Sequence, residues 1–401
     1  MFILLFNAGS SSLKGSLVHS DTGQPVASAV VDWVTLPSQY RLTTPDRVVR
    51  DEQVHWKGYA QAVQQIMADL VPEFLPDISR LAAVGHRVVH GGDFTQPVRI
   101  TDSIRTQIES LIQLAPLHNP PSLETITAAQ SLLPDIPHIA VFDTAFHSTM
   151  PDWARNYPIP QAWRTEFGIR KFGFHGLSHE YASRRASELL NRPLSDLKLV
   201  ICHLGHGCSA TAVSGGKSVD TTMGFTPLEG LMMATRSGSI DPGIIPYLQS
   251  TRGLAAGEIE QALNRQSGLI AVSGISSDMR QVVQSAEQGN RDAVLALQMY
   301  TYRVRKAIGA LAAGMGGIDA LIFTAGVGEN ARSVRQAICS GLECLQLELD
   351  PVANTTAVPD SDIATASSRG RILIIAARED LMMLEGVKKA LREHEVAGGV
   401  Q

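Results

Sequence analysis

A glycine, three serines and a lysine follow the first apolar segment of the chain and form a candidate phosphate-binding turn. Residues 2–6 are apolar, and Asn7-Ala-Gly-Ser-Ser-Ser-Leu-Lys14 leads from them into a second extended stretch, 15–18. Glycine lets the backbone approach an oxyanion, the serines offer donors, and Lys14 adds a charge. A Walker loop instead has glycine before lysine and a helix next. The pattern predicts a phosphate-binding hairpin turn, with a solvated hairpin tip as the alternative.

Two more glycine-rich turns follow apolar, strand-like segments. Residues 203–207 follow the strand 198–203 and leave as a strand, 210–213, which repeats the strand–turn–strand unit of the N-terminus. Residues 326–330 follow the strand 319–324, and a helix begins close by. Three such turns indicate a nucleotide bound through its phosphates and its ribose and base. The repeated unit indicates a duplicated two-domain protein with a cleft between the domains.

Candidate charged residues lie beside these glycines. Arg87 and Arg236 stand in glycine-containing segments, and their planar guanidinium groups suit the oxygens of a transferring phosphoryl group, although a surface arginine is the alternative reading. Asp143 ends the strand 138–143 and is either a catalytic carboxylate or the cap of the next turn. Glu379 is the best single carboxylate for Mg²⁺, and Asn7 could add its amide oxygen.

Two histidine pairs have the i, i+4 spacing of zinc ligands. His86 and His90 lie in a strand-like stretch, whereas His175, paired with His179, is followed by a glycine. No third ligand stands near either pair, so we do not predict a zinc site.

Composition limits the class of protein. The chain has 401 residues, which is enough for two hydrophobic cores. Its net charge is −5 and the sequence contains no block of like charges, so we expect no nucleic-acid partner. Its apolar runs are too short to cross a membrane, and no secretory signal is apparent. Four cysteines lack metal-site spacing and are expected to be buried, reduced thiols of a cytoplasmic protein: Cys202, Cys208, Cys339 and Cys344.

Strand-like and helix-like segments alternate, which predicts an α/β fold. Helices are expected over 57–70 and 291–314. Three further helices are expected: one capped by Asp102, one opened by Asn119 and one beginning at Glu379. Strands are expected over 81–90 and 371–376. We predict an N-terminal domain over 1–148, with 380–401 packing back on it, and a C-terminal nucleotide-binding domain over 149–379.

These motifs together resemble those of the acetate kinase family, in the family's order and over nearly the whole chain. The resemblance implies the duplicated, actin-like and ribonuclease-H-like fold, with an interdomain nucleotide cleft, that sugar kinases and heat-shock chaperone ATPases share. It also implies a homodimer and reversible, Mg²⁺-dependent phosphoryl transfer from ATP to acetate, giving acetyl phosphate and ADP, with Mn²⁺ as an alternative ion. The matching segments are residues 7–14, Gly85-His-Arg-Val-Val-His-Gly-Gly92, Ala115-Pro-Leu-His-Asn-Pro-Pro121, Phe142-Asp-Thr-Ala-Phe-His147, Lys171-Phe-Gly-Phe-His-Gly176, Thr235-Arg-Ser-Gly238 and 323–330.

The resemblance also implies a role for each matching residue. Metal binding falls to Asn7 and Glu379, and catalysis to Arg87, His118, Asp143, His175 and Arg236. Nucleotide binding falls to Ser10, Ser12, Lys14, His203, Leu204, Gly205, His206, Gly207, Asp278, Met279, Arg280, Gly326, Val327, Gly328, Glu329 and Asn330. An apolar pocket that limits acyl length falls to Val89, Leu117, Phe174 and Pro227.

The chemistry needs no general base, because acetate is already anionic at neutral pH. Asp143 is therefore expected to orient an arginine or the metal. The chain departs from the family's usual residues at His206, Ser239, Leu177 and 377–378.

Alternative functions remain at this point. A propionate kinase is the alternative within the class, because one methylene in an apolar pocket decides only about 1–3 kcal/mol. A weakly active nucleotide-binding regulator on the same scaffold is a further alternative. Pyrophosphate as the donor is disfavoured, because Gly326 and Gly328 leave room for an adenosine.

Overall fold

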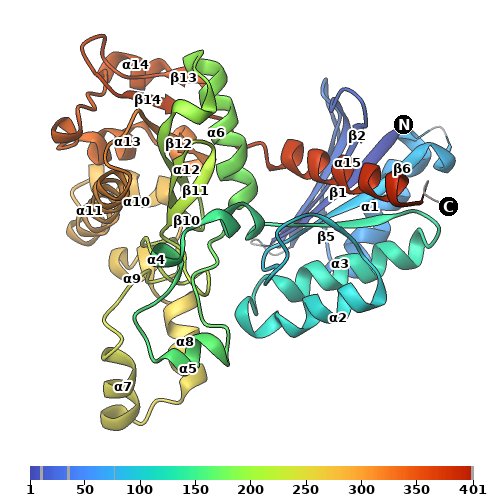
Figure 1. Ribbon diagram of the computed structural model, residues 1–401, viewed down its shortest axis with the longest axis horizontal. Coiled ribbons are helices and arrows are strands. Elements are labelled where there is room, and N and C mark those ends of the chain that lie inside the picture. Colours follow the sequence, from blue (N-terminus) through green and yellow to red (C-terminus); the bar gives the residue numbers. More distant parts are fainter. Residues whose placement is uncertain (10–11, 34–36, 76, 399–401) are drawn as a thin grey trace. The chain divides into compact units, whose positions relative to one another are not determined.

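The chain divides into two compact units. The computed structural model describes residues 1–398 apart from 10–11, 34–36 and 76 (Figure 1). One unit comprises residues 1–145 and 378–401, and the other comprises residues 146–377. The domain limits predicted from the sequence, 1–148 and 149–379, fall at neighbouring residues and stay a prediction about functional domains.

The first unit is built on a mixed sheet that has eight strands in the described residues, in the order β5-β4-β3-β2-β1-β6-β8-β7. Strands β1, β2 and β3 form an antiparallel meander, and β6 and β8 extend the sheet in parallel with β1. The strands are β1 (Phe2–Ala8), β2 (Ser12–His19), β3 (Pro25–Asp32), β4 (Ser38–Thr43), β5 (Val48–Val54), β6 (Leu81–Val88), β7 (Val98–Arg99) and β8 (His138–Phe142).

The second unit repeats this arrangement. Its described sheet has the order β11-β10-β9-β12-β14-β13, in which β9, β10 and β11 are antiparallel and β12 and β14 run parallel to β9. The repeated order confirms the predicted duplicated α/β fold of actin-like type. The strands are β9 (Lys198–Leu204), β10 (Cys208–Ser214), β11 (Lys217–Thr221), β12 (Ala320–Thr324), β13 (Ser361–Asp362) and β14 (Arg371–Ile374).

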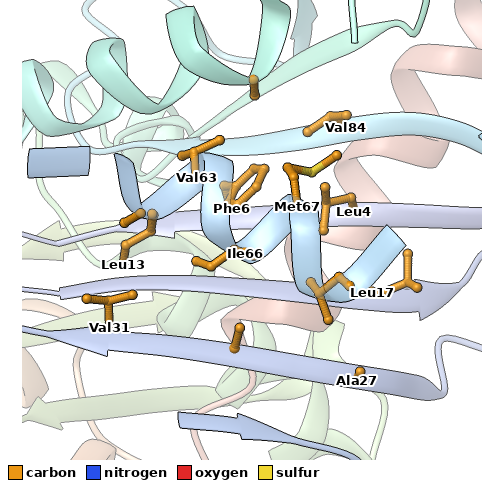
Figure 2. Close-up of a cluster of buried hydrophobic side chains, with 14 of the residues drawn as sticks. Leu4, Phe6, Leu13, Leu17, Ala27, Val31, Val63, Ile66, Met67 and Val84 are labelled. Atoms are coloured by element: carbon orange, nitrogen blue, oxygen red, sulfur yellow. The ribbon is translucent and has the colours of Figure 1, made fainter. Parts of the chain in front are cut away.

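Alternation along the strands decides which side chains enter the core of the first unit. Leu4 and Phe6 of β1 point to one face of the sheet, where α1 (Gly58–Phe74) and α3 (Asn119–Leu132) cover them. Figure 2 shows Val63, Ile66 and Met67 of α1 packed on the apolar side chains of β1, β2, β3 and β6.

The opposite face of that sheet is covered by the C-terminal helix α15 (Glu379–Gly398). Gly85 of β6 permits the contact, because a Cβ there would lie 2.6 Å from Val387 of α15 and 2.8 Å from Leu5. The sequence prediction of a helix from Glu379 onward is confirmed.

In the second unit, α6 (Gly176–Leu190) and α11 (Arg291–Gly314) pack on different side chains of the sheet. Leu199 and Ile201 of β9 pack with Ala182 and Ala186 of α6. Cys208 of β10 instead meets Tyr300 of α11, with 3.2 Å between Sγ and the phenol oxygen. The predicted helix over 291–314 is confirmed at both ends.

Three local predictions are wrong. The side chain that caps α2 (Asp102–Ser110) is that of Thr101, and Asp102 is the first helical residue. Residues 326–330 belong to a helix, α12 (Ala325–Asn330), so they are not an open turn. Cys344 is exposed, whereas the other three cysteines are buried free thiols.

The remaining helices are short, and none of the described helices is long and apolar enough to cross a membrane. They are α4 (Asp152–Arg155), α5 (Gln161–Thr165), α7 (Ile244–Arg252), α8 (Ala256–Arg265), α9 (Gly268–Ser273), α10 (Met279–Glu287), α13 (Arg332–Cys339) and α14 (Pro351–Thr356).

Candidate active site

Four predicted site residues meet at one end of the first unit's sheet. Asn7, Arg87 and Asp143 lie at or just after the carboxyl ends of three neighbouring parallel strands, β1, β6 and β8. Alternate residues of a strand point to the same side of the sheet, and these three residues alternate in step with Leu5 and Gly85. They therefore lie on the face that α15 covers. Glu379 is the first residue of α15 and reaches the same place.

Arg87 is the centre of this group. Its guanidinium donates twice to Asp143, from Nε to Oδ1 at 3.0 Å and from Nη2 to Oδ2 at 2.5 Å. Nη1 donates to Oδ1 of Asn7 at 2.9 Å, and the Asn7 amide donates to Oε2 of Glu379 at 3.0 Å. Asp143 has no exposed surface, so this bidentate contact fixes the guanidinium plane.

The electrostatics keep Arg87 charged. Burial alone disfavours the charged guanidinium, but the carboxylates of Asp143 and Glu379 outweigh it and raise the pKa of Arg87 above its ordinary value. A partly buried, permanently charged planar donor is suited to hold a carboxylate or an acyl phosphate.

The chemistry of the donors in this group fits Mg²⁺. The described residues contain no cluster of three or more histidine, cysteine, aspartate or glutamate side chains for a metal. Mg²⁺ does not require one, because it keeps several waters and takes one or two protein oxygens together with substrate phosphates. The Glu379 carboxylate and the Asn7 amide oxygen are hard donors of that kind.

The predicted phosphate-binding turn joins β1 to β2. The N–H of Gly9 donates to the Ser12 carbonyl at 2.8 Å, and the register places Lys14 directly opposite Asn7. Opposed residues of an antiparallel pair point to the same face, so the exposed Lys14 lies on the face that carries Asn7. Ser10 lies outside the described residues.

In the second unit, histidines gather where α6 begins. His175 immediately precedes the helix in a left-handed conformation (φ 58°), and His179 follows one turn later. Nδ1 of His175 and Nε2 of His179 both lie within hydrogen-bond distance of the Ser209 hydroxyl, at 2.9 and 2.7 Å. His203 bonds to Ser178 at 2.8 Å and stacks on His175, with ring centroids 4.1 Å apart.

Gly173, two residues before His175, makes room for the ring of another histidine, His147. Gly173 has φ +79°, and a Cβ there would lie 2.6 Å from the His147 ring. A larger residue would therefore displace His147, whose Nε2 bonds to the carbonyl of Phe174 at 2.9 Å.

The turn between β9 and β10 brings His175 and Arg236 together. A Cβ placed on Gly207 would lie 3.4 Å from Nε2 of His175 and 3.7 Å from Nη1 of Arg236. The same nitrogen of Arg236 donates to the Pro227 carbonyl at 3.2 Å. Burial lowers the pKa of Arg236 from its ordinary value. A desolvated cation beside a histidine and a glycine turn is a strong site for an anion.

The start of α12 borders the same turn. Ala325 has φ +65°, and a Cβ on Gly205 would lie 3.7 Å from the Ala325 side chain. Buried Arg335 holds the other end of α12 by donating to the carbonyls of Gly328 and Glu329 at 2.9 and 2.8 Å. Residues 203–207 and 325–330 are therefore neighbours, as a nucleotide site requires.

The predicted adenosine segment over 278–280 has internal contacts. Asp278 caps α10 and pairs with Arg280 at 2.6 Å, and this hydrogen bonding lowers the pKa of Asp278. Met279 is buried, so its side chain belongs to the core. Contact with the base remains a prediction.

The four predicted pocket residues are divided between the units. Val89 is buried and Leu117 half-buried in the first unit, and Phe174 is buried and Pro227 half-buried in the second. His118 lies beside Leu117 and precedes α3, where its carbonyl accepts from the N–H of Ser122 at 3.3 Å.

Two of the residues that depart from the family's usual pattern have defined local contacts. The Ser239 hydroxyl accepts from the N–H of Gly230 at 3.0 Å and so ties the loop that carries Pro227. His206 lies in the turn beside Arg236, and partial burial of the ring together with the charge of Arg236 lowers its pKa.

Ser209 is a site residue that was not predicted from the sequence, although it follows the glycine turn by two residues. The hairpin register that places it opposite His203 comes only from the structure. The spacing of His179 from His175 suggested only a zinc ligand.

Comparison with known proteins gives the family. The profile of the Acetokinase family matches residues 2–385. An acetate kinase of Thermoanaerobacterium thermosaccharolyticum is 45% identical over 394 residues, which cover 97% of this chain and 98% of the relative. The crystal structure of Porphyromonas gingivalis acetate kinase is 37% identical, with a TM-score of 0.86, and covers 97% of this chain and 99% of its own. That of a Francisella tularensis propionate kinase is 38% identical, with a TM-score of 0.89, and covers 96% and 98%. The resemblance inferred from the motifs is thereby confirmed, and the chain belongs to the acetokinase family of carboxylate kinases.

Proposed function

We propose that the protein transfers the γ-phosphoryl group of ATP to acetate, reversibly, giving acetyl phosphate and ADP. The observation that carries the proposal is the match of nearly the whole chain to acetate kinases. The geometry supports it, because each unit gathers charged donors around a glycine-containing strand end.

The residues of the first unit would bind the acceptor. Arg87 would hold the carboxylate, and Asp143 would keep the guanidinium plane in position through the two hydrogen bonds already described. Acetate arrives as an anion, so Asp143 needs to remove no proton. Asn7 and Glu379 would hold Mg²⁺, with Mn²⁺ as an alternative; such an ion neutralises charge on the phosphate oxygens.

The residues of the second unit would act on the phosphoryl group. Arg236 and the Nε2 edge of His175 would donate to its oxygens, where negative charge is greatest in the transition state. Residues 203–207 would bind phosphate groups, and the family resemblance implies the same role for Ser10, Ser12 and Lys14 of the first unit. Residues 278–280 and 326–330 would contact adenosine.

An assay with a series of acids tests the substrate. Formate, acetate, propionate and butyrate are each supplied with MgATP, and the acyl phosphate is trapped with hydroxylamine. Acetate is expected to show the highest kcat/KM. A clear preference for propionate would make this a propionate kinase, and no acyl phosphate from any acid would leave a nucleotide-binding regulator.

A variant of the predicted apolar pocket tests how acyl length is limited. Val89→Ala is expected to raise kcat/KM for propionate relative to acetate by roughly ten-fold or more, since one methylene in an apolar pocket is worth about 1–3 kcal/mol. An unchanged ratio would remove Val89 from the pocket.

We also propose a cytoplasmic homodimer. Large apolar side chains of the second unit are exposed, among them Trp153 (88%), Phe167 (65%) and Tyr247 (55%). Exposed aromatic residues are typical of protein–protein interfaces, and a second copy is the partner that the family resemblance implies. The cytoplasm is consistent with free thiols at Cys202, Cys208 and Cys339.

A further inference from the structure

The Ser209 hydroxyl joins two histidines of the second unit. It lies 2.9 Å from Nδ1 of His175 and 2.7 Å from Nε2 of His179. Ser209 and His179 are fully buried. A hydroxyl has one proton, so it donates to one of two neutral rings and accepts from the other.

With both rings neutral, only two arrangements of protons satisfy both hydrogen bonds. In the first, Nε2–H of His179 donates to Ser209, Ser209 donates to Nδ1 of His175, and His175 has its own proton on Nε2. In the second, every direction is reversed, so His179 has its proton on Nδ1 and His175 has a lone pair on Nε2. The two arrangements therefore present opposite groups at Nε2 of His175.

The surroundings of His179 favour the first arrangement. Nδ1 of His179 is buried and has no hydrogen-bond partner among the residues that the structure describes. The second arrangement would place an N–H donor there, and an unsatisfied buried donor is rare and costly. Burial also lowers the pKa of His179 well below its ordinary value, which keeps the ring neutral.

We infer that Ser209 and His179 are positioning residues that hold His175 as the tautomer protonated on Nε2. The Nε2 edge of His175 faces Gly207, beside Nη1 of Arg236. A donor at this edge can bind a phosphoryl oxygen, whereas a lone pair would repel it. The inference rests on the proposed role of His175 and adds the two residues that set its proton.

Kinetics of four variants test this hydrogen-bond relay, which runs from His179 through Ser209 to His175. Ser209→Ala and His179→Phe each remove this relay and are expected to lower kcat by about 10- to 100-fold, the range found when a partner that orients a metal-ligating histidine is lost, while the KM values for ATP and acetate change within about two-fold. His179→Gln keeps an amide donor near the position of Nε2 and is expected to restore most of kcat. Ser218→Ala removes an equally buried serine–histidine bond, Oγ to Nδ1 of His147 at 2.8 Å, and is expected to leave kcat near that of the wild type.

Combination with His175→Ala separates the relay from the proposed function. The double variant Ser209→Ala/His175→Ala is expected to be no slower than His175→Ala alone, because the relay acts through that ring. Full activity of His175→Ala would overturn the proposed role of His175 and the relay with it. A large loss in His175→Ala with wild-type kcat in Ser209→Ala would overturn the relay alone.

Nitrogen NMR reads the tautomer directly and does not depend on activity. In protein labelled with ¹⁵N-histidine, the His175 resonances are identified by their loss in His175→Asn. Nε2 is expected to resonate as a protonated ring nitrogen and Nδ1 as an unprotonated one, and Ser209→Ala is expected to mix the two forms. A wild-type ring protonated on Nδ1 would overturn the inference.

Discussion

At the scale of single residues, the pair Arg87–Asp143 is expected to stabilise the first unit as well as bind substrate. Asp143 is fully buried, and Arg87→Ala removes its bidentate partner. We expect the free energy of unfolding to fall by about 3 kcal/mol, within the range for breaking a buried ion pair. Urea unfolding measures it, and Arg87→Ala/Asp143→Ala should recover part of the loss. The KM for acetate should rise as well, and an unchanged KM would exclude Arg87 from carboxylate binding.

Arg236 should act mainly on turnover. Its charge is desolvated and lies beside His175 at Gly207, where it would meet the phosphoryl group. We expect Arg236→Ala to lower kcat by about 10³-fold, as loss of a transition-state arginine does, with the KM for ATP little changed. Turnover close to that of the wild type would refute the role. Arg236→Lys, which keeps the charge and loses the planar donors, should recover only part of kcat.

His147 is expected to make stability depend on pH. Burial lowers its pKa to about 4, the hydrogen bond to the Phe174 carbonyl opposes this, and Lys171 adds to it. The folded pKa lies below the unfolded value of about 6.5, so the unfolded chain binds more protons between these values. Stability is therefore full above about pH 6.5 and is lost as pH falls towards 4, by roughly 3 kcal/mol for this residue. Urea unfolding across this range, repeated with His147→Gln, should show a smaller loss in the variant; equal slopes would contradict the assignment.

At the scale of elements, the contact between β6 and α15 depends on Gly85. A Cβ there would meet Val387 at 2.6 Å and Leu5 at 2.8 Å, so Gly85→Ala should destabilise the protein by about 1–3 kcal/mol through overpacking. Gly309 of α11 is the matched control, because a Cβ there would meet nothing within 4 Å. Gly309→Ala should instead stabilise by up to about 1 kcal/mol. Equal effects of the two changes on the thermal midpoint would contradict this account of the packing.

At the scale of the whole molecule, the proposed homodimer predicts an effect of charge at its surface. Tyr247→Glu replaces an exposed aromatic side chain of α7 and should raise the dissociation constant of the dimer by about 30-fold or more, as loss of a central interface residue does. Sedimentation velocity over a dilution series measures it. Val352→Glu, an apolar residue of α14 with 74% exposure, is the control and should not shift the equilibrium. A wild-type protein that sediments as a monomer would reject the dimer.

The kinds of elements and the chemistry at their ends could be predicted from the order of amino acids. Short apolar runs indicated the strands, the helix over 291–314 was identified at both ends, and Asn7, Arg87 and Asp143 were recognised at strand ends. These features are local, because side-chain period and turn residues depend on neighbours along the chain. The order of motifs over nearly the whole chain gave the family for the same reason.

Which of these groups touch depends on how the elements pack in three dimensions. Asn7 and Glu379 form a hydrogen bond across 372 positions of sequence, and Ser209 meets His175 and His179 through the pairing of a hairpin with a helix. Helix α12 and the Thr101 cap likewise differ from the local expectation. Contacts of this kind depend on which faces pack together, and a buried histidine's proton depends on the partners that packing supplies, so neither could be read from spacing alone.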